Sequence, residues 1–564
     1  MQNLAQPIQS SEFPVEAIRA AAEQTADPVA VFEAAFARLS SDSTALLNDD
    51  VLDALRTIRQ KDEAAYERLT AKASGQKTRL DKLTRPSRDG HDDSAAGQVI
   101  KIAKESCKFA HNADGRGVAI VDEGDSRKVW YINSPEFGDW LRSIYFQKTE
   151  SGITDLALGT AVCTLAALGK HAGEEVEVHI RCAKHGDDYY IDLCDDEWRV
   201  VRVGKTGWSL ETRSPVLFTR TKNMRSLPTP TCAPTLDLLW KHVNVPEERR
   251  NELLTWLLDS YRPDTPFPIL EITGEHGTAK STMQRKFRSL TDPNKVALRG
   301  RPKSVEDIFV AAANNWMCSF ENLSHLSAEQ QDALCTLATG GGFATRQHYT
   351  NGDEHVLETK RPVMVNGINS VLTQPDAIDR TICIEAQTIP PDQRKDEQML
   401  TIEWEADYPG IFVGLLDLFA RALAILPDIT LTDKQRMADY QLLGEAVAQV
   451  LGHEPGHFST TFCSRVAEGA DRSLETYGVA GAVQVLLVEN GSCSWEGTIL
   501  ALKRKLESLS DIDRSNWPKS PRGLSGQLRR LAPGLRRRGV VIEHLGHGRA
   551  GSNVRLSLSH VAAI

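Results

Sequence analysis

The spacing of apolar and polar residues divides the first part of the chain into three segments. In residues 1–70, runs such as VEAIRAAAEQ, VAVFEAAFARL and VLDALRTIRQ repeat apolar positions at helical intervals. Residues 71–99 are polar and rich in Gly, Ser and Asp without periodicity, which is typical of a linker. Residues 100–226 combine short alternating runs with one helical pattern. We therefore predict a helical N-terminal module, a linker and an α+β accessory domain.

A proline-rich segment marks the next predicted boundary. LPTPTCAPT, residues 227–235, carries three prolines in nine positions. Beyond it, strands alternate with helices over residues 236–388, and a mainly helical pattern follows over residues 389–494. Residues 495–564 combine helices with two β-like runs. The chain is thus predicted to be a multidomain α/β protein.

The strongest chemical signal lies in PFPILEITGEHGTAKSTMQRKF, residues 266–287. An apolar run typical of a buried strand ends at Gly274, and a helix is expected to open at Lys280. The loop N–H groups and the helix N-terminus can hold phosphates, Lys280 can reach the β- and γ-phosphates, and Ser281 can bind Mg²⁺. The predicted nucleotide-binding residues are Gly274, Gly277, Thr278, Ala279, Lys280, Ser281 and Thr282.

One position departs from the usual phosphate-loop pattern. Glycine is expected directly before the lysine, whereas this chain has Ala279. Alanine is small enough for close approach of a phosphate, provided that this position is helical. The departure weakens the match without removing it, and the alternative is a Gly-rich turn that arose by chance.

Three further polar residues follow apolar runs downstream. Glu321 ends the run WMCSF, where a second strand would present a carboxylate to Mg²⁺ and to the attacking water. Asn366 ends RPVMVN, where a neutral amide can orient a water molecule. Arg380 lies between a short helix and a β-like run, where it can stabilise transition-state charge in a neighbouring subunit. We predict these three as catalytic residues, and Ser281 and Glu321 as metal ligands.

In this order the motifs resemble the superfamily 3-type helicase ATPases of the AAA+ class, in particular the primase-helicase-like ATP-binding proteins of phages, plasmids and integrated elements. The resemblance extends from about Asp125 to the C-terminus and rests on GEHGTAKST, FENLSHLS, RPVMVNGI, PDAIDRTI and KQRMADY. It implies a P-loop AAA+ ATPase core. The implied roles are Walker A for Lys280 and Ser281, Walker B for Glu321, sensor for Asn366 and arginine finger for Arg380. Glu321 departs from the family, which often has Asp there, and members usually assemble as hexameric rings.

Residues 343–360, FATRQHYTNGDEHVLETK, predict a hairpin with its turn at Asn351–Gly352. In similar helicases such a hairpin points into the ring channel and grips DNA. The resemblance therefore implies contacts to single-stranded DNA at Arg346, His348, Tyr349, His355 and Lys360. The alternative is a surface hairpin with ordinary polar residues.

The distribution of charge sets the C-terminus apart from the remainder of the chain. The 564 residues carry a formal net charge of -10. From Ala501 onward there are 13 Lys and Arg against 4 Asp and Glu, so the first 500 residues carry -19. A local basic module on an acidic chain favours a local contact with nucleic acid.

The basic module has the layout of a winged helix. Ser520 and Pro521 open a predicted helix with an apolar stripe, Gly539 ends it, and Pro533 is expected to kink or divide it. Two β-like runs then flank a Gly-rich loop at 546–551. Predicted contacts to duplex DNA are Arg522, Arg529, Arg530, Arg536, Arg537, Arg538 and Arg549. The alternative is a charged face that packs on the acidic remainder of the chain.

Composition adds several expectations about the setting of the protein. No apolar run approaches 18 residues and the start lacks the layout of a signal peptide, so we expect a cytoplasmic protein with no membrane contact. The ten scattered cysteines, without a CxxC motif, favour reduced thiols. The acidic run over residues 187–197 offers oxygen ligands for Mg²⁺, but hairpin turns and exposed strand faces explain it better.

These patterns lead to one preferred function and two alternatives. We expect an ATP-dependent DNA helicase or translocase that uses ATP and Mg²⁺ as a homo-oligomeric ring in the replication of a phage, plasmid or integrated element. A DNA-stimulated ATPase without unwinding, for origin melting or nucleic-acid sensing in host–phage conflict, would carry the same motifs. A non-enzymatic DNA-binding protein that uses ATP only to assemble remains the third possibility.

Overall fold

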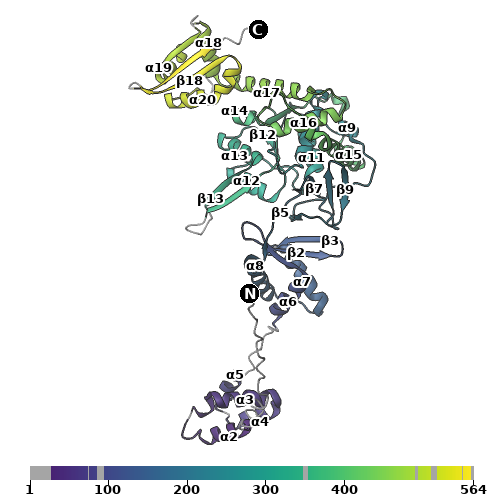
Figure 1. Cartoon of the computed structure of the whole chain (residues 1–564), viewed down its shortest axis with the longest axis vertical. Coiled ribbons are helices and arrows are strands. Elements are labelled where there is room, and N and C mark those ends of the chain that lie inside the picture. Colours follow the sequence, from purple (N-terminus) through teal and green to yellow (C-terminus); the bar gives the residue numbers. More distant parts are fainter. Residues whose placement is uncertain are drawn as a thin grey trace, which may run out of the picture. The chain divides into compact units, whose positions relative to one another are not determined.

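The protein is a mixed α/β chain with several separate sheets (Figure 1). The computed structural model describes residues 27–42, 44–73, 75–84, 94–346, 354–489, 493–509, 517–548 and 551–559. By its contacts the chain divides into two compact units, residues 1–101 with 153–157, and the remainder. The predicted multidomain α/β class is confirmed at this level.

The first unit is a helical module around its own apolar core. Its helices are α2 (Pro28–Ala37), α3 (Asp49–Lys61), α4 (Glu63–Lys72) and α5 (Lys77–Leu83), with a 3-10 turn at Ala45–Leu47. Helix α5 lies inside the segment predicted as a linker. Two contacts explain why this segment is helical. The Leu80 side chain is fully buried in the core, and the hydroxyl of Thr84, just after the helix, shares a 2.6 Å hydrogen bond with the Tyr66 hydroxyl. One buried leucine and one buried hydrogen bond are too weak a pattern to show in the sequence.

The second unit begins, after α6 (Ala95–Ser106), with a small α+β layer. Its four-stranded sheet has the order β3-β2-β1-β4. The elements are β1 (Lys108–His111), β2 (Gly117–Glu123), β3 (Ser126–Tyr131), α7 (Pro135–Thr149), α8 (Asp155–Ala172) and β4 (Glu174–Glu175). Short parallel strands β5 (Val178–His179) and β10 (Leu217–Phe218) follow as a separate pair.

An antiparallel sheet of consecutive strands comes next in the chain. It comprises β6 (Cys182–His185), β7 (Asp188–Asp192), β8 (Val200–Gly204) and β9 (Gly207–Glu211). Its inner face packs on the long helix α15, where Tyr189 lies 5.4 Å from the ring of Phe419 and the Trp208 indole donates a 2.6 Å hydrogen bond to Asp417. This sheet therefore shares a core with the central region.

The central region is built on a parallel sheet with the strand order β12-β15-β11-β16. The strands are β11 (Ile269–Thr273), β12 (Cys318–Leu323), β15 (Val363–Gly367) and β16 (Thr381–Glu385). β11 and β15 are fully buried, which explains their continuous apolar runs. The strands predicted around the three downstream motifs belong to this one sheet, in which β12 and β15 are neighbours and β16 lies beyond β11.

Helices cover this sheet and extend beyond it (Figure 1). They are α9 (Leu239–His242), α10 (Arg250–Asp259), α11 (Lys280–Thr291), α12 (Val305–Asn314), α13 (Ala328–Thr339), α14 (Pro375–Ile378), α15 (Glu397–Ile425), α16 (Ala438–Val450) and α17 (His457–Thr476). Short 3-10 turns lie at Leu236–Leu238, Glu247–Arg249, Pro391–Gln393 and Leu426–Asp428. Strands β13 (Gly341–Arg346) and β14 (Glu354–Thr359) form the predicted hairpin.

One helix segment, Glu397–Asp428, is long and apolar enough by length and composition to cross a membrane. Two thirds of its most apolar stretch is buried inside the protein. Phe412, Leu416 and Phe419 lie in the same apolar cluster as residues of β11 and α11. Packing in this core accounts for the apolar character of the helix.

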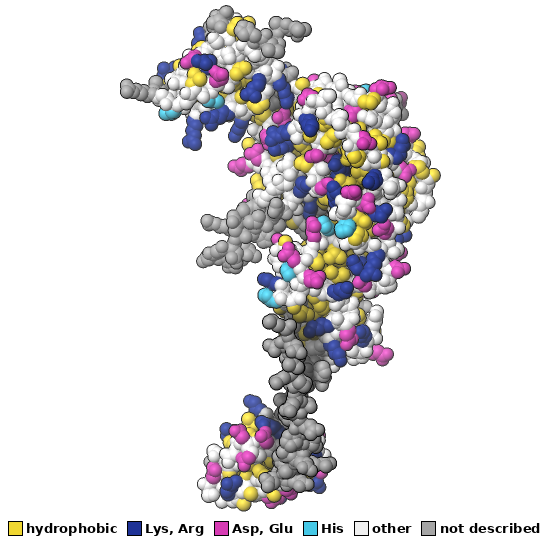
Figure 2. All heavy atoms as spheres, in the orientation of Figure 1, with side chains coloured by type: hydrophobic (Ala, Val, Ile, Leu, Met, Phe, Trp, Pro, Cys, Tyr) yellow, Lys and Arg dark blue, Asp and Glu magenta, His cyan; other side chains and the backbone are white. Residues whose placement is uncertain are grey.

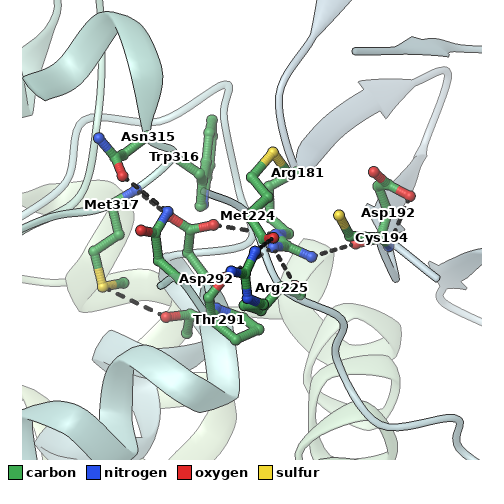
Figure 3. Close-up of polar contacts among 12 residues, drawn as sticks. Arg181, Asp192, Cys194, Met224, Arg225, Thr291, Asp292, Asn315, Trp316 and Met317 are labelled. Carbon is green, nitrogen blue, oxygen red and sulfur yellow. Dashed lines mark hydrogen bonds and ion pairs between the residues drawn. The ribbon is translucent and has the colours of Figure 1, made fainter. Parts of the chain in front are cut away.

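A buried ion pair joins the β6–β9 sheet to the end of α11 (Figure 3). The Arg181 guanidinium donates from Nε to Asp292 Oδ1 at 3.2 Å, and its other nitrogens donate to the carbonyl oxygens of Asp192 and Arg225 at 2.9 and 2.8 Å. Asp292 Oδ2 accepts from the Met317 N–H at 3.1 Å. Both charged side chains are completely buried, so the predicted boundary near residue 226 lies within a continuous core.

The C-terminal part combines three helices with a three-stranded antiparallel sheet of order β17-β19-β18. Its elements are α18 (Gly478–Glu489), β17 (Ser494–Thr498), α19 (Ile499–Glu507), α20 (Pro521–Arg537), β18 (Val540–Gly548) and β19 (Gly551–Leu558). The expectation that Pro533 divides the helix is wrong, because α20 continues past Pro533 to Arg537. Pro533 is exposed, and burial of Leu531 and Leu535 on either side holds the helix in place.

Candidate functional site

The loop between β11 and α11 depends on two glycines. Gly274 has a φ of +139°, and a β-carbon there would lie 2.8 Å from the Ala386 carbonyl oxygen. Gly277 has a φ of +78° and is exposed. Both positions therefore require glycine, the first for space and backbone conformation and the second for conformation. The predicted strand, loop and helix are present in the expected order.

Ala279 is not in the right-handed helical conformation that the sequence argument required. Its φ and ψ are 62° and 25°, and it is the N-cap of α11. The left-handed conformation is unfavourable by about 1–2 kcal/mol for a residue with a β-carbon. The loop thus keeps the backbone path of a glycine at this position while carrying an alanine.

Lys280 turns back over the loop that precedes it. Its Nζ donates to the carbonyl oxygens of Gly274 and Glu275 at 2.8 and 2.6 Å, and to Thr278 Oγ1 at 3.4 Å. Partial burial lowers the pKa of its ammonium group. No side chain caps α11, and its first turn contains no acidic residue. A cation and the N–H groups of a helix N-terminus therefore meet at one point, which suits a phosphate.

Asn366 links the two strands β15 and β12 to helix α11 at this edge of the sheet. Its Oδ1 accepts from the Asn322 N–H at 2.8 Å, and its Nδ2 donates to Gln284 and, at 3.4 Å, to Ser281 Oγ. Gln284 in turn donates to Ser319 Oγ at 2.8 Å. Asn366 is fully buried. The predicted sensor Asn366 thus contacts both Ser281 and the end of β12, so that these two groups lie next to each other.

Glu321 lies in β12, directly before Asn322, which has a left-handed φ of 55°. Its side chain is partly exposed and makes no hydrogen bond or ion pair with the described residues. With Ser281 it offers an oxygen-only set of ligands, which fits Mg²⁺. In the part of the chain that the structure describes, no group of three or more His, Cys, Asp or Glu residues is arranged to hold a metal.

Arg380 follows α14 and precedes β16, as predicted, but its side chain is largely enclosed. The guanidinium is 16% exposed and forms an ion pair with Asp376. Arg436 also binds Asp376, at 2.6 Å. Within one copy of the chain, Arg380 is therefore engaged by a carboxylate of its own helix.

Two residues next to the loop were missed by the sequence argument. Asn244 Nδ2 donates to the Thr278 carbonyl oxygen at 3.2 Å and to the Gln387 carbonyl oxygen at 2.5 Å. A β-carbon at Gly277 would lie 3.3 Å from Nη2 of Arg394. Neither residue belongs to a local pattern, because only the tertiary fold brings these segments to the loop.

The hairpin is present, with Arg346 opposite Glu354 and Thr345 opposite His355. The backbone of Arg346 and His355 is described, whereas their side chains, and His348 and Tyr349 altogether, lie outside the described residues. Lys360 is at the base of the hairpin, where its Nζ lies 5.8 Å from the ring of Phe267 and burial lowers its pKa. Its contact to DNA stays a prediction.

The acidic run over residues 187–197 is engaged in ion pairs. Asp192 binds Arg220 at 2.6 Å, and Asp195 binds Arg199 at 2.7 Å. The Asp188 carboxylate lies 3.6 Å from Arg202. These contacts give the acids a structural use, although Asp192 is buried and does not lie on an exposed strand face.

The basic helix α20 presents its arginines to solvent on the side away from its core. Leu524, Leu528, Leu531 and Leu535 are buried, whereas Arg522, Arg529, Arg530, Arg536 and Arg537 are exposed. Figure 2 shows a group of Lys and Arg side chains on this part of the molecule. Arg538 is partly exposed, and Arg549 lies outside the described residues.

Some of these arginines also face the central region. Arg529, Arg530 and Arg537 line a cavity of about 390 Å³ together with Asp376 and Asp379. Burial raises the pKa of Asp379, and the positive charge of Arg537 opposes that shift. The structure therefore leaves room for both predicted uses of the helix, a contact to DNA and packing on acidic residues.

Two family models match the chain. The model described as "Actinomycete integrative conjugative element replication protein" matches residues 236–454, and the model "AICE RepA C-terminal domain" matches residues 479–562. A comparison with curated proteins finds no match.

Among solved structures, three apo structures of the NrS-1 C-terminal region are similar to the chain at 11–12% identity. Each covers 82% of this chain and 98–99% of its own length, with TM-scores of 0.33–0.36. The two family models fall on the parallel-sheet region with its helices and on the C-terminal helices and sheet. In these two regions the chain is similar to the replication proteins of actinomycete integrative conjugative elements.

Proposed function

We propose that the protein is an ATP-dependent DNA helicase or translocase that works as a ring-shaped homo-oligomer, with a hexamer favoured, in the replication of its element. One observation carries this proposal. Lys280 and the start of α11 meet the loop after β11, and Asn366 links Ser281 to the end of β12. This arrangement fits a nucleoside triphosphate with its metal, and the match to a replication family supports a role on DNA.

Each residue has a distinct part in the proposed hydrolysis. The backbone N–H groups of residues 274–282 and the Lys280 ammonium bind the phosphates of ATP. Ser281 and Glu321 would hold Mg²⁺, which neutralises phosphate charge when bound. Glu321, whose carboxylate has no partner among the described residues, accepts a proton from the attacking water or orients it. Asn366 positions Ser281 through a hydrogen bond, and it holds the backbone beside Glu321 by accepting from the Asn322 N–H.

Arg380 is proposed to act on the nucleotide of a neighbouring subunit. Its ion pair with Asp376 within one copy means that this role requires the guanidinium to leave Asp376 when the neighbour binds ATP. An arginine acts well in such a role because its planar group can donate two hydrogen bonds to phosphate oxygens. Assembly into a ring thereby becomes a condition for hydrolysis.

The contact to DNA is proposed to have two parts. The C-terminal sheet and α20 are proposed to form a winged helix that binds duplex DNA through exposed arginines, since helix, hairpin and basic surface occur together. The β13–β14 hairpin is proposed to contact single-stranded DNA in the ring channel. The match of residues 479–562 to the C-terminal domain of a replication protein supports the first part.

ATP turnover tests this proposal directly. Purified full-length protein is assayed with no DNA, with single-stranded DNA and with duplex DNA, alongside unwinding of a forked duplex. We expect Lys280→Ala to reduce turnover by about 100-fold or more, and Glu321→Gln to bind ATP while turnover stops. Lys205→Ala, an exposed lysine in the β8–β9 turn, serves as a matched control with unchanged turnover. Wild-type turnover in Lys280→Ala would refute the phosphate-loop assignment, and turnover without unwinding would favour a DNA-stimulated ATPase.

A further inference from the structure

Arg394 lies against the loop that follows β11, at Gly277. Its Nη2 and Cζ are 3.3 and 3.7 Å from the position that a β-carbon would take at Gly277. Because Gly277 has no side chain, the guanidinium faces the loop backbone directly. Arg394 comes directly after the 3-10 turn Pro391–Gln393, far from the loop in sequence.

The segment that carries Arg394 is attached to the loop by a second contact. The amide of Asn244 donates hydrogen bonds to the carbonyl oxygens of both Thr278 and Gln387. Thr278 itself is 1% exposed and is therefore packed inside the protein. Asn244 thus holds the start of the segment after β16 beside the loop, and Arg394 follows in the same segment.

The guanidinium of Arg394 makes no hydrogen bond or ion pair with the described residues, and the residue is exposed. Two other cations of this part of the chain are paired with carboxylates. Lys395 binds both carboxylate oxygens of Glu403, at 3.1 and 2.8 Å. Arg380 is bound to Asp376. Arg394 is therefore a cation beside the loop with its donors available.

We infer that Arg394 binds the phosphates of the nucleotide from within the same subunit, opposite Lys280 across the loop. This inference rests on the proposed function. A triphosphate concentrates several negative charges over the loop, and Lys280 supplies one point charge from the helix side. A guanidinium on the other side adds a planar pair of donors that match phosphate oxygens.

Nucleotide binding by single variants tests this assignment. Binding of ATP, ADP and inorganic tripolyphosphate is measured by calorimetry on the full-length protein. Arg394→Gln is expected to raise the Kd for ATP and for tripolyphosphate by about 10-fold or more, because hydrogen bonds to charged groups contribute strongly. Arg394→Lys should recover part of the affinity, and Lys395→Gln should leave it unchanged. The exposed position of Arg394 predicts unchanged thermal unfolding without nucleotide, which is the control for folding.

Three outcomes would overturn the inference, and they separate it from the proposed function. Normal ATP affinity in Arg394→Gln, with loss of affinity in Lys280→Ala, would refute only the role of Arg394. Weaker ATP and ADP binding with unchanged tripolyphosphate binding would mean that Arg394 contacts the base or sugar instead. Absence of ATP binding in the wild-type protein would overturn the proposed function together with the inference.

Discussion

The edge of the parallel sheet and the basic helix α20 use polar residues in opposite ways. At the sheet edge, Asn366 and Gln284 are buried and hydrogen-bonded to each other. Thr278 is also buried, and its carbonyl oxygen accepts a hydrogen bond from Asn244. On α20 the arginines are exposed, and only the leucine stripe is buried. Residues that share a network affect one another when changed, whereas separated surface charges contribute nearly additively. Loss of one residue should therefore disable the first region and only weaken the second.

The largest expected effect concerns Arg380, which lies at the amino end of β16 beside the start of β11. If it completes a neighbour's site, Arg380→Ala should lose hydrolysis by about 1000-fold while it still binds ATP. A mixture with Lys280→Ala should recover part of the turnover, because one interface in the mixed ring pairs an intact loop with an intact arginine. The measurement is ATP turnover against the mixing ratio. Absence of any recovery in mixtures shown by mass to form oligomers would exclude action between subunits.

The second test addresses additivity on α20. Arg522, Arg529, Arg530, Arg536 and Arg537 are changed together to Gln, which leaves the leucine stripe intact. If each contacts one phosphate, the slope of log K against log salt for duplex DNA should become less steep by about 4.5, at about 0.9 for each contact. Binding is measured over a series of salt concentrations.

The single variant Arg529→Gln is the control for additivity, with an expected change in slope of about 0.9. An unchanged slope in the five-residue variant would mean that these arginines pack on Asp376, Asp379 and other acids of the chain itself. Substitution is a better probe than truncation before Trp495, because α18 shares its apolar core with α19 and α20.

A third test compares stability in the two regions. Asn366→Ala removes the acceptor of the Asn322 N–H and the donor to the side-chain oxygen of Gln284, while Gln284 keeps its bond to Ser319. The free energy of unfolding should fall by about 2–3 kcal/mol. The exposed Arg529→Gln should change it by less than about 0.5 kcal/mol. Denaturant unfolding of both variants checks the difference, and equal values would show that the sheet edge is not a coupled network.

The smallest expected effect concerns Ala279. Because its φ is positive, Ala279→Gly should raise the free energy of unfolding by about 0.5–1 kcal/mol. The same substitution at the exposed helical position Ala467 should lower it by about 1 kcal/mol. Thermal or denaturant unfolding distinguishes the two signs. A loss of stability in Ala279→Gly would mean that the alanine methyl group makes a favourable contact at the loop.

Local patterns predicted much of the fold and of the candidate site. The buried run before Gly274, the helix from Lys280 and the leucine stripe of α20 each depend on residues close together in sequence. The order of the strand-end motifs also predicted that Ser281, Glu321 and Asn366 act around one nucleotide, and Ser281 and Asn366 lie within 3.4 Å of each other. Such features survive in a sequence because their interactions are short-range or periodic.

The remaining features depend on contacts between distant segments. Asn244 and Arg394 reach the loop only because the chain returns to it before α10 and after β16, and neither carries a periodic signal. The left-handed Ala279 was unexpected because residue type favours the opposite conformation. Pro533 was expected to kink or divide its helix, and the helix is not divided, because burial of the leucines on both sides outweighs the lost hydrogen bond.

The buried pair Arg181–Asp292 has a mechanical consequence. Removal of one partner of such a pair leaves an uncompensated charge in the interior, at about 3–5 kcal/mol, so thermal motion rarely separates the two. Asp292 directly follows α11, the helix that begins at the loop, and Arg181 directly precedes β6. If the proposed hydrolysis displaces α11, the ion pair would make the β6–β9 sheet move with that helix. The accessory sheet would then transmit force rather than merely support the core.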